Sequence, residues 1–256
     1  MKIKLIVCDL DRTLLKTDKS ISERSVAAFE KCKPNGIMTA IATARSEWAS
    51  KRICDILKPD VCILNSGGLV MYQGTELYKR MLSADTTDGI ITELVNNPVV
   101  GDIAVATQDR YLVSYTSPPD HPDYANGIIY NFRKPLSVPT YKITAEVFGS
   151  KLGHEIAAKY PNCSYVSYIG ELWGKFAHFE AEKMTALEAV LPRLGIIAAQ
   201  VAAFGDDMVD LELIKRCGVG VAVENAIPEI KEAADEITGS NDENGVADWI
   251  EKNLLF

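Results

Sequence analysis

Two carboxylates and a hydroxyl follow the first apolar run of the chain. Asp9 and Asp11 follow residues 5–7 after one intervening cysteine, and Thr13 stands two positions after Asp11. An ionised aspartate can attack phosphorus and form an aspartyl-phosphate, while a second carboxyl protonates the leaving oxygen and then activates water. A phosphate dianion repels a carboxylate, so this chemistry requires Mg²⁺ and a lysine nearby. The same residues are also compatible with a solvated turn, which Asp and Thr favour.

A candidate phosphate-binding group follows the second apolar run. Residues 36–42 predict a buried strand, and Thr43, Ala44 and Arg45 stand between it and a helix predicted over residues 47–57. A hydroxyl and free backbone amides at a helix start can bind a phosphoryl group. Alternatively, Thr43 serves only as the N-cap of that helix.

The lysine and a second acidic strand end occur late in the chain. Lys183 begins a helix predicted over residues 183–191, and Asp206, Asp207 and Asp210 follow a strand predicted over residues 201–204. The carboxyl ends of parallel strands meet at one edge of a sheet, where ligands bind, so we expect these groups to converge with Asp9 and Asp11. Taken alone, Lys183 would be a solvated lysine at a helix start, where the helix dipole does not favour a cation.

Strands and helices alternate in both terminal parts of the chain. This alternation, with strands that read as continuous apolar runs, predicts an α/β fold with a Rossmann-like parallel sheet. The expected strands cover residues 5–7, 36–42, 61–64, 201–204, 219–223 and 236–238. The expected helices cover residues 22–30, 47–57, 183–191, 211–216, 228–234 and 246–254.

The middle of the chain has a different pattern. Alternating strands with polar faces, two helices near residues 87–96 and 151–159, and a loop with Pro118, Pro119 and Pro122 predict an inserted α+β domain. We expect its sheet to be antiparallel and covered by both helices on one side. The expected division is therefore a core domain of residues 1–81 and 179–256 and an inserted domain of residues 82–178.

Composition limits the classes of partner. The 256 residues are 47% hydrophobic with a formal net charge of −8, and the absence of a dense Lys/Arg tract argues against nucleic-acid or anionic-membrane binding. The N-terminus shows no signal-peptide pattern and no apolar run approaches a membrane span, so we expect a cytoplasmic protein. The six cysteines form no C-x-x-C pair, which favours reduced thiols over disulfides or a zinc site.

The candidate site residues, taken in order, resemble the haloacid dehalogenase superfamily over the whole chain. The four motifs of the resemblance are Asp9-Leu10-Asp11-Arg12-Thr13, Thr43, Lys183 and Gly205-Asp206-Asp207-Met208-Val209-Asp210. The insertion between the Thr and Lys motifs resembles Cof-type phosphatases that carry an α/β cap domain of the C2 class. Two further sequences support this subclass, Asn225-Ala226 and Asn244-Gly245-Val246-Ala247.

The resemblance implies a role for each matching residue. Asp9 would be the nucleophile and Asp11 the general acid and base, while Thr43, Ala44 and Lys183 would bind the phosphoryl group. Mg²⁺ would be held by Asp9, the backbone carbonyl of Asp11 and Asp206. Asp210 would bind the metal through water or orient a ligand. The remaining residues expected around the site are Asp207, Arg45, Asn65 and Asn225.

Three positions depart from the family pattern. Ala44, directly after Thr43, stands where relatives usually have Gly. Arg12 stands where the family commonly has Gly, which requires a local backbone adjustment. Val209 stands where relatives commonly have Asn, which removes a hydrogen-bonding group near the metal and could lower activity.

The function implied by the resemblance is a Mg²⁺-dependent phosphatase acting on a small phosphorylated metabolite, such as a sugar phosphate. A phosphomutase of the phosphomannomutase type is an alternative, and it would need basic residues in the cap. The candidates there are scattered: Arg110, Arg133, Lys134, Lys142 and Lys151. A non-catalytic protein that binds Mg²⁺ and a phosphorylated ligand is a second alternative, motivated by Val209. We expect a monomer or a weak homodimer.

Overall fold

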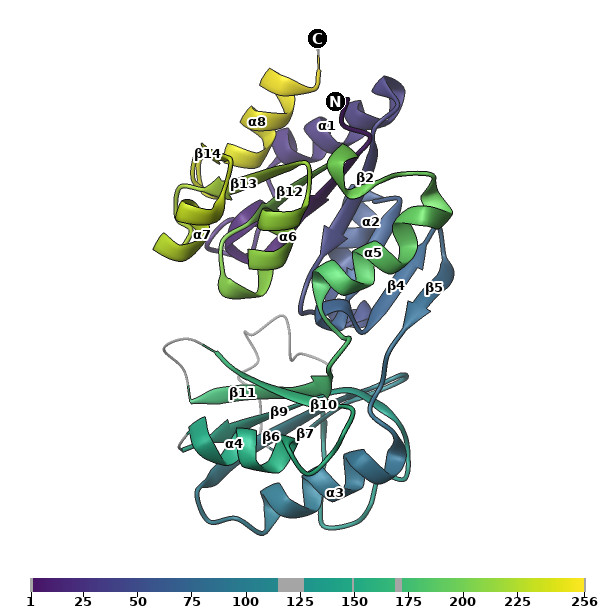
Figure 1. Ribbon diagram of the computed structural model, residues 1–256, viewed down its shortest axis with the longest axis vertical. Coiled ribbons are helices and arrows are strands. Elements are labelled where there is room, and N and C mark those ends of the chain that lie inside the picture. Colours follow the sequence, from purple (N-terminus) through teal and green to yellow (C-terminus); the bar gives the residue numbers. More distant parts are fainter. Residues whose placement is uncertain (1, 115–126, 149, 169–171, 256) are drawn as a thin grey trace. The chain divides into compact units, whose positions relative to one another are not determined.

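The computed structural model describes residues 2–114, 127–148, 150–168 and 172–255, and the loop with Pro118, Pro119 and Pro122 lies outside them. The chain divides into two compact units (Figure 1). The first consists of Met1–Lys79 and Glu182–Phe256, and the second of Arg80–Ala181. None of the helices formed by the described residues has the length and apolar character that crossing a bilayer requires.

An eight-stranded sheet is the centre of the first unit. Its strands are β1 (Leu5–Cys8), β2 (Met38–Ala42), β3 (Val61–Leu64), β4 (Leu69–Tyr72), β5 (Thr75–Lys79), β12 (Val201–Gly205), β13 (Val219–Val223) and β14 (Glu236–Thr238). Their order is β14-β13-β12-β1-β2-β3-β4-β5, and the pairs from β14 to β3 are parallel. The expected α/β fold with a parallel-rich sheet is confirmed, and β1 lies at its centre.

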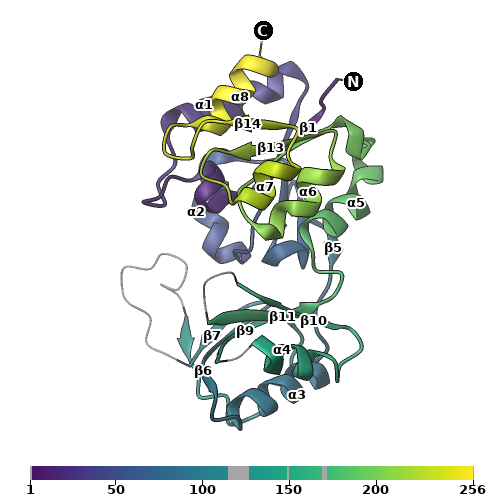
Figure 2. The ribbon, with the colours of Figure 1, turned by 60° about the vertical axis from the view of Figure 1, so that its left-hand side comes forward.

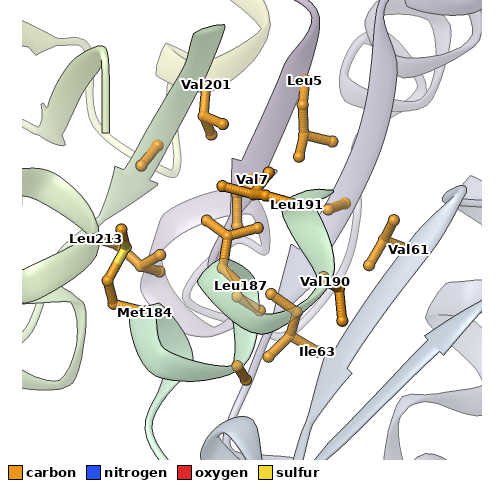
Figure 3. Close-up of a cluster of buried hydrophobic side chains, with 14 of the residues drawn as sticks. Leu5, Val7, Val61, Ile63, Met184, Leu187, Val190, Leu191, Val201 and Leu213 are labelled. Carbon is orange, nitrogen blue, oxygen red and sulfur yellow. The ribbon is translucent and has the colours of Figure 1, made fainter. Parts of the chain in front are cut away.

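Helices cover both faces of this sheet. They are α1 (Glu23–Cys32), α2 (Glu47–Leu57), α5 (Lys183–Leu194), α6 (Leu211–Arg216), α7 (Pro228–Ala233) and α8 (Gly245–Asn253). On one face, Val7 and Ile63 of the sheet pack with Leu187 of α5 (Figure 3). On the other face, the ring of Phe204 packs edge-on against the ring of Trp249 in α8, with the ring centroids 5.2 Å apart. Burial on both faces explains why β1 is a continuous apolar run, since successive side chains point to opposite sides.

The hairpin β4–β5 extends the sheet antiparallel to β3, and no element was expected there. Its two turn residues, Gln73 and Gly74, both have positive φ, at 47° and 81°. Positive φ at both central positions is the geometry of a two-residue hairpin turn whose twist matches its strands. A Gln-Gly sequence gives only a weak signal for that turn, compared with Asn-Gly or Asp-Gly.

The second unit contains a six-stranded sheet with two helices on one side of it (Figure 2). Its strands are β6 (Val100–Thr107), β7 (Tyr111–Val113), β8 (Ile128–Ile129), β9 (Thr140–Val147), β10 (Cys163–Ser167) and β11 (Trp173–His178), and its helices are α3 (Ala84–Val95) and α4 (Ser150–Ala157). The order is β10-β11-β9-β6-β7-β8, antiparallel except for β7 and β8. Helix α3 begins one turn earlier than expected because Ser83 caps it, accepting a hydrogen bond from the amide of Thr86.

Candidate active site

The segment after β1 is a tight turn that presents Asp9 and Asp11. The turn Leu10–Leu14 is closed by a 2.8 Å hydrogen bond from the Leu15 amide to the Leu10 carbonyl. Within it, Arg12 has a φ of 61°, in the left-handed region that favours glycine. The adjustment expected for an arginine at this position is therefore a left-handed backbone, and the arginine side chain is exposed.

Two asparagines hold this turn by its backbone carbonyls. Asn225 Nδ2 donates to the carbonyl of Arg12 at 2.7 Å, and Asn225 Oδ1 accepts from the amide of Asn241 at 2.9 Å. Asn241 Nδ2 in turn donates to the carbonyl of Leu15 at 3.0 Å. Asn225, which was expected around the site, thus contacts this turn at the residue directly after Asp11. Asn241 was not singled out from the sequence.

Three carboxylates converge at the end of β1 and β12. Asp9, Asp206 and Asp210 each offer one oxygen, and these atoms lie within 4.8 Å of one another. Lys183 Nζ lies 2.6 Å from Asp9 Oδ1 and 2.6 Å from Asp210 Oδ1, and its side chain is 1% exposed. Burial on its own would lower the pKa of Lys183, but the charges of Asp210 and Asp9 raise it above the ordinary value. Lys183 is therefore a buried permanent cation between two carboxylates.

The remaining negative charge of the cluster is not offset by Lys183. Burial raises the pKa of Asp9, against the opposing effect of Lys183, and the carboxylates of Asp210 and Asp206 raise it further. Burial also raises the pKa of Asp206 to about 6, although Thr13 Oγ1 donates a 2.8 Å hydrogen bond to it. Clustered carboxylate oxygens are the donors that a hard divalent cation such as Mg²⁺ prefers. The residues present fit that ion.

Gly205 allows Asp210 to reach this cluster. A Cβ atom at position 205 would lie 2.4 Å from the Cβ of Asp210. Asp210 Oδ2 accepts a hydrogen bond from the amide of Asp206 at 3.3 Å, so the two acids are fixed relative to each other. Asp207, by contrast, accepts from the amide of Met208 at 2.6 Å and caps the short turn after β12.

Asp11 points to two cations instead of joining the carboxylate cluster. Arg45 binds it through two nitrogens, Nε to Oδ2 at 2.8 Å and Nη2 to Oδ1 at 2.7 Å. Lys19 Nζ donates to Asp11 Oδ1 at 2.8 Å. Burial alone would raise the pKa of Asp11, but the hydrogen bonds and charges of Arg45 and Lys19 lower it from 3.8 to about 2. Lys19 carried no sequence signal, because its role depends on the fold of the turn.

This lowered pKa predicts a contribution to stability that is lost at acid pH. Since the folded-state pKa lies below the ordinary value, the ion pairs stabilise the fold fully above 3.8, and this is lost as the pH falls toward about 2. We expect Asp11→Asn to show a shallower loss of urea midpoint than the unmodified protein between about pH 5 and pH 2. Asp55→Asn, at an exposed carboxylate, is the control. An equal acid dependence in all three proteins would contradict the prediction.

Thr43 lies in a buried turn between β2 and α2. Its Oγ1 accepts a hydrogen bond from the amide of Arg45 at 3.2 Å, with Ala44 between them. The N-cap of α2 is Ser46, which accepts from the amide of Ala49 at 3.3 Å. The alternative that Thr43 caps this helix is therefore wrong, because the N-cap lies three residues later.

The loop after β3 fixes this turn from the other side. The amide of Ser66 donates to the Thr43 carbonyl and that of Asn65 to the Arg45 carbonyl, both at 2.9 Å. Asn65 and Ser66 have positive φ values of 51° and 60°. The Oδ1 atom of Asn65 is buried and has no hydrogen-bond partner among the described residues. Asn65 thus lies next to the Thr43 turn.

Gly67 brings this loop against the residue before Lys183. Its φ is +100°, and a Cβ there would lie 2.3 Å from the backbone oxygen of Glu182. We expect Gly67→Ala to lower the free energy of unfolding by about 2–4 kcal/mol, which combines overpacking and left-handed strain. Because backbone must move, turnover should fall as well.

A matched control separates these two costs. Gly74 also has a positive φ, of +81°, but nothing lies within 4 Å of a Cβ there. Gly74→Ala should therefore cost only about 1–2 kcal/mol and leave turnover unchanged. Urea unfolding and phosphate release measure both effects, and equal behaviour of the two variants would contradict the assigned contact with Glu182.

Comparison with known proteins places this arrangement in a family. A family model described as haloacid dehalogenase-like hydrolase matches residues 6–250. The chain is 29% identical to the putative phosphatase YxeH of Bacillus subtilis, over 98% of both chains. It is 26% identical to the 5-amino-6-(5-phospho-D-ribitylamino)uracil phosphatase YcsE of the same organism, over 99% of this chain and 96% of that one.

A solved structure shows the same fold. A haloacid dehalogenase-like hydrolase from Bacteroides thetaiotaomicron superposes with a TM-score of 0.84 at 24% identity, covering 98% of this chain and 99% of that one. The family model, the relatives and the fold agree with the four motifs. The chain belongs to the haloacid dehalogenase-like hydrolase family.

Proposed function

We propose that the protein is a Mg²⁺-dependent phosphatase that hydrolyses a small phosphorylated metabolite, such as a sugar phosphate, through an aspartyl-phosphate on Asp9. The observation that carries the proposal is the pairing of Asp9 with the buried Lys183, beside the carboxylates of Asp206 and Asp210. The relatives named as phosphatases, one of them for a phosphoribityl compound, support the reaction class.

The metal-binding residues in this proposal are Asp9, Asp206 and Asp210, with the backbone carbonyl of Asp11 as a further ligand. When bound, Mg²⁺ offsets the charge of the phosphoryl oxygens and so reduces their repulsion of the attacking carboxylate. Thr13 orients one of these ligands by donating a hydrogen bond to Asp206. A group that orients a metal-binding carboxylate in this way commonly increases the affinity of the site for the metal.

Asp9 attacks phosphorus with a carboxylate oxygen. Lys183 holds that carboxylate in place by a hydrogen bond, and its ammonium charge favours the ionised form of Asp9 against the larger opposing effect of burial. The hydroxyl of Thr43 and the turn through Ala44 and Arg45 bind the phosphoryl group, since this turn directly precedes the N-cap of α2. Lys183 adds positive charge next to the attacking carboxylate of Asp9.

Asp11 transfers the protons. Its pairing with Arg45 and Lys19 favours the ionised carboxylate, which is the form that takes a proton from the attacking water in the second step. Protonating the leaving oxygen in the first step requires the opposite form. That step therefore requires Asp11 to exchange its contacts with Arg45 and Lys19 for contacts with the substrate.

Release of inorganic phosphate from a panel of phosphorylated metabolites tests the proposal. We expect turnover with Mg²⁺ and its loss when EDTA removes the metal. Free phosphate also separates a hydrolase from a mutase, which returns the phosphoryl group to its product, and from a non-catalytic binder. Binding of Mg²⁺ without phosphate release from any panel member would contradict the phosphatase.

A further inference from the structure

Two of the six cysteines contact each other in the first unit. Cys54 of α2 and Cys62 of β3 have their sulfur atoms 3.7 Å apart, and both side chains are only partly buried. Cys8, Cys32 and Cys217 are buried. Access and a neighbouring thiol are the two conditions that thiol oxidation to a disulfide requires.

The backbone holds this pair together. In β3, Val61 and Ile63 point into the core cluster on the α5 side, so Cys62 between them points to the opposite face. Helix α2 ends at Leu57, and Lys58 reverses the chain with a φ of 48° while its amide donates to the Cys54 carbonyl at 2.8 Å. The helix end and the strand that follows it thus place the two sulfurs in contact through a short connection.

We propose that Cys54 and Cys62 form a reversible dithiol–disulfide site that a hydroperoxide oxidises. The site is separate from the proposed phosphatase chemistry and does not depend on it. A disulfide here would link α2 to β3 without using Asp9, Lys183 or Thr43.

Either sulfur can donate the hydrogen bond between the two thiols. This bond lowers the pKa of Cys54, against the effects of burial and of the carboxylates of Asp55 and Glu47, and it raises the pKa of Cys62, so the thiolate forms more readily at Cys54. Lys51, one helical turn before Cys54, also lowers the Cys54 pKa. The thiolate is the nucleophilic form of cysteine.

The oxidation then proceeds in two balanced steps. The Cys54 thiolate attacks one oxygen of the hydroperoxide, an S–O bond forms, the O–O bond breaks, and the leaving oxygen departs with a proton as water or an alcohol. The Cys62 sulfur attacks Cys54, the S–O bond breaks, and the hydroxide leaves as water with the Cys62 proton. Two thiols are oxidised by two electrons and the peroxide is reduced. A dithiol reductant reverses the bond.

Mass spectrometry of the full-length protein tests the site. After treatment with hydrogen peroxide and alkylation of free thiols, trypsin leaves both cysteines in one peptide, residues 53–79, because Lys58 precedes a proline. We expect this peptide to lose two hydrogen masses and both alkyl groups, and to regain both alkylation sites after dithiothreitol. Cleavage before Asp55 and Asp60 should leave two peptides joined by a reducible bond.

Serine variants supply the controls. Cys54→Ser and Cys62→Ser should each abolish the linked species, while Cys163→Ser, at another partly buried cysteine in the second unit, should leave it unchanged. The peptide analysis of the unmodified protein tests the disulfide on its own, so the test does not depend on whether a variant folds. Two free thiols in residues 53–79 under peroxide that oxidises Cys163 would overturn the proposal, as would irreversible oxidation of Cys54 without a linked species.

Discussion

Lys183→Met is expected to lower the free energy of unfolding by about 3–5 kcal/mol, the usual cost of removing one partner from a buried ion pair. Lys183 is the cation 2.6 Å from both Asp9 and Asp210, and all three side chains are buried. Removing it leaves two carboxylates to repel each other away from water. Urea unfolding in EDTA measures the effect without compensation by a metal, and phosphate release should be lost in the same variant.

A surface lysine provides the comparison for this variant. Lys51 pairs with Asp55 on an exposed helix face, so Lys51→Met should change stability by no more than about 0.5 kcal/mol. Lys183→Arg keeps the charge but not the shape, because a planar guanidinium does not replace a compact ammonium. It should regain part of the stability and little of the activity. Equal stability of Lys183→Met and Lys51→Met would contradict the assigned ion pairs.

Asp9→Asn is expected to reduce phosphate release by at least about 10⁴-fold, the scale at which removal of a nucleophile acts in enzymes. Its stability should stay the same or increase. The reason is that burial raises the pKa of Asp9, so the ionised form is unfavourable in the fold and a neutral amide relieves that cost. Unlike the two carboxylates in Lys183→Met, Lys183 keeps a partner in this variant, because it also pairs with Asp210. Phosphate release and urea unfolding of the same preparation separate the two effects.

The combination of lost activity and retained stability is the informative result. Asp55→Asn, at an exposed carboxylate that pairs with Lys51 on α2, should retain full activity. A stable Asp9→Asn variant with the metal-dependent turnover of the unmodified protein would contradict the nucleophile assignment. A variant that unfolds would contradict the account of Asp9 burial.

The elements that depend on local sequence could be predicted well. The apolar run of β1 and its acidic end located Asp9 and Asp11, and Ser22 caps α1 as expected, accepting from the amide of Ser25 at 3.0 Å. Such features can be predicted because the residues that determine a strand or a helix cap lie within a few positions of one another in the sequence. The hairpin β4–β5 was missed because its Gln73-Gly74 turn adopts positive φ without the usual Asn-Gly signal.

The contacts that depend on distant residues could not be predicted. The positions of the motifs at strand ends predicted that Asp9, Lys183 and Asp206 meet at one edge of the sheet. They did not predict that Asp210 contacts Lys183 directly. Nor did they predict that Lys19 pairs with Asp11, because a lysine in a polar segment looks like any solvated lysine. Thr13 carried a signal, since it belongs to the first motif, and its partner Asp206 lies 193 positions away.

Borohydride trapping during turnover tests the central claim most directly. An aspartyl-phosphate is reduced by borohydride to homoserine, and residues 5–12 form one tryptic peptide that contains both Asp9 and Asp11. We expect homoserine at position 9 only when substrate and Mg²⁺ are present. Homoserine at position 11, or phosphate release with no trapped residue, would contradict an aspartyl-phosphate on Asp9.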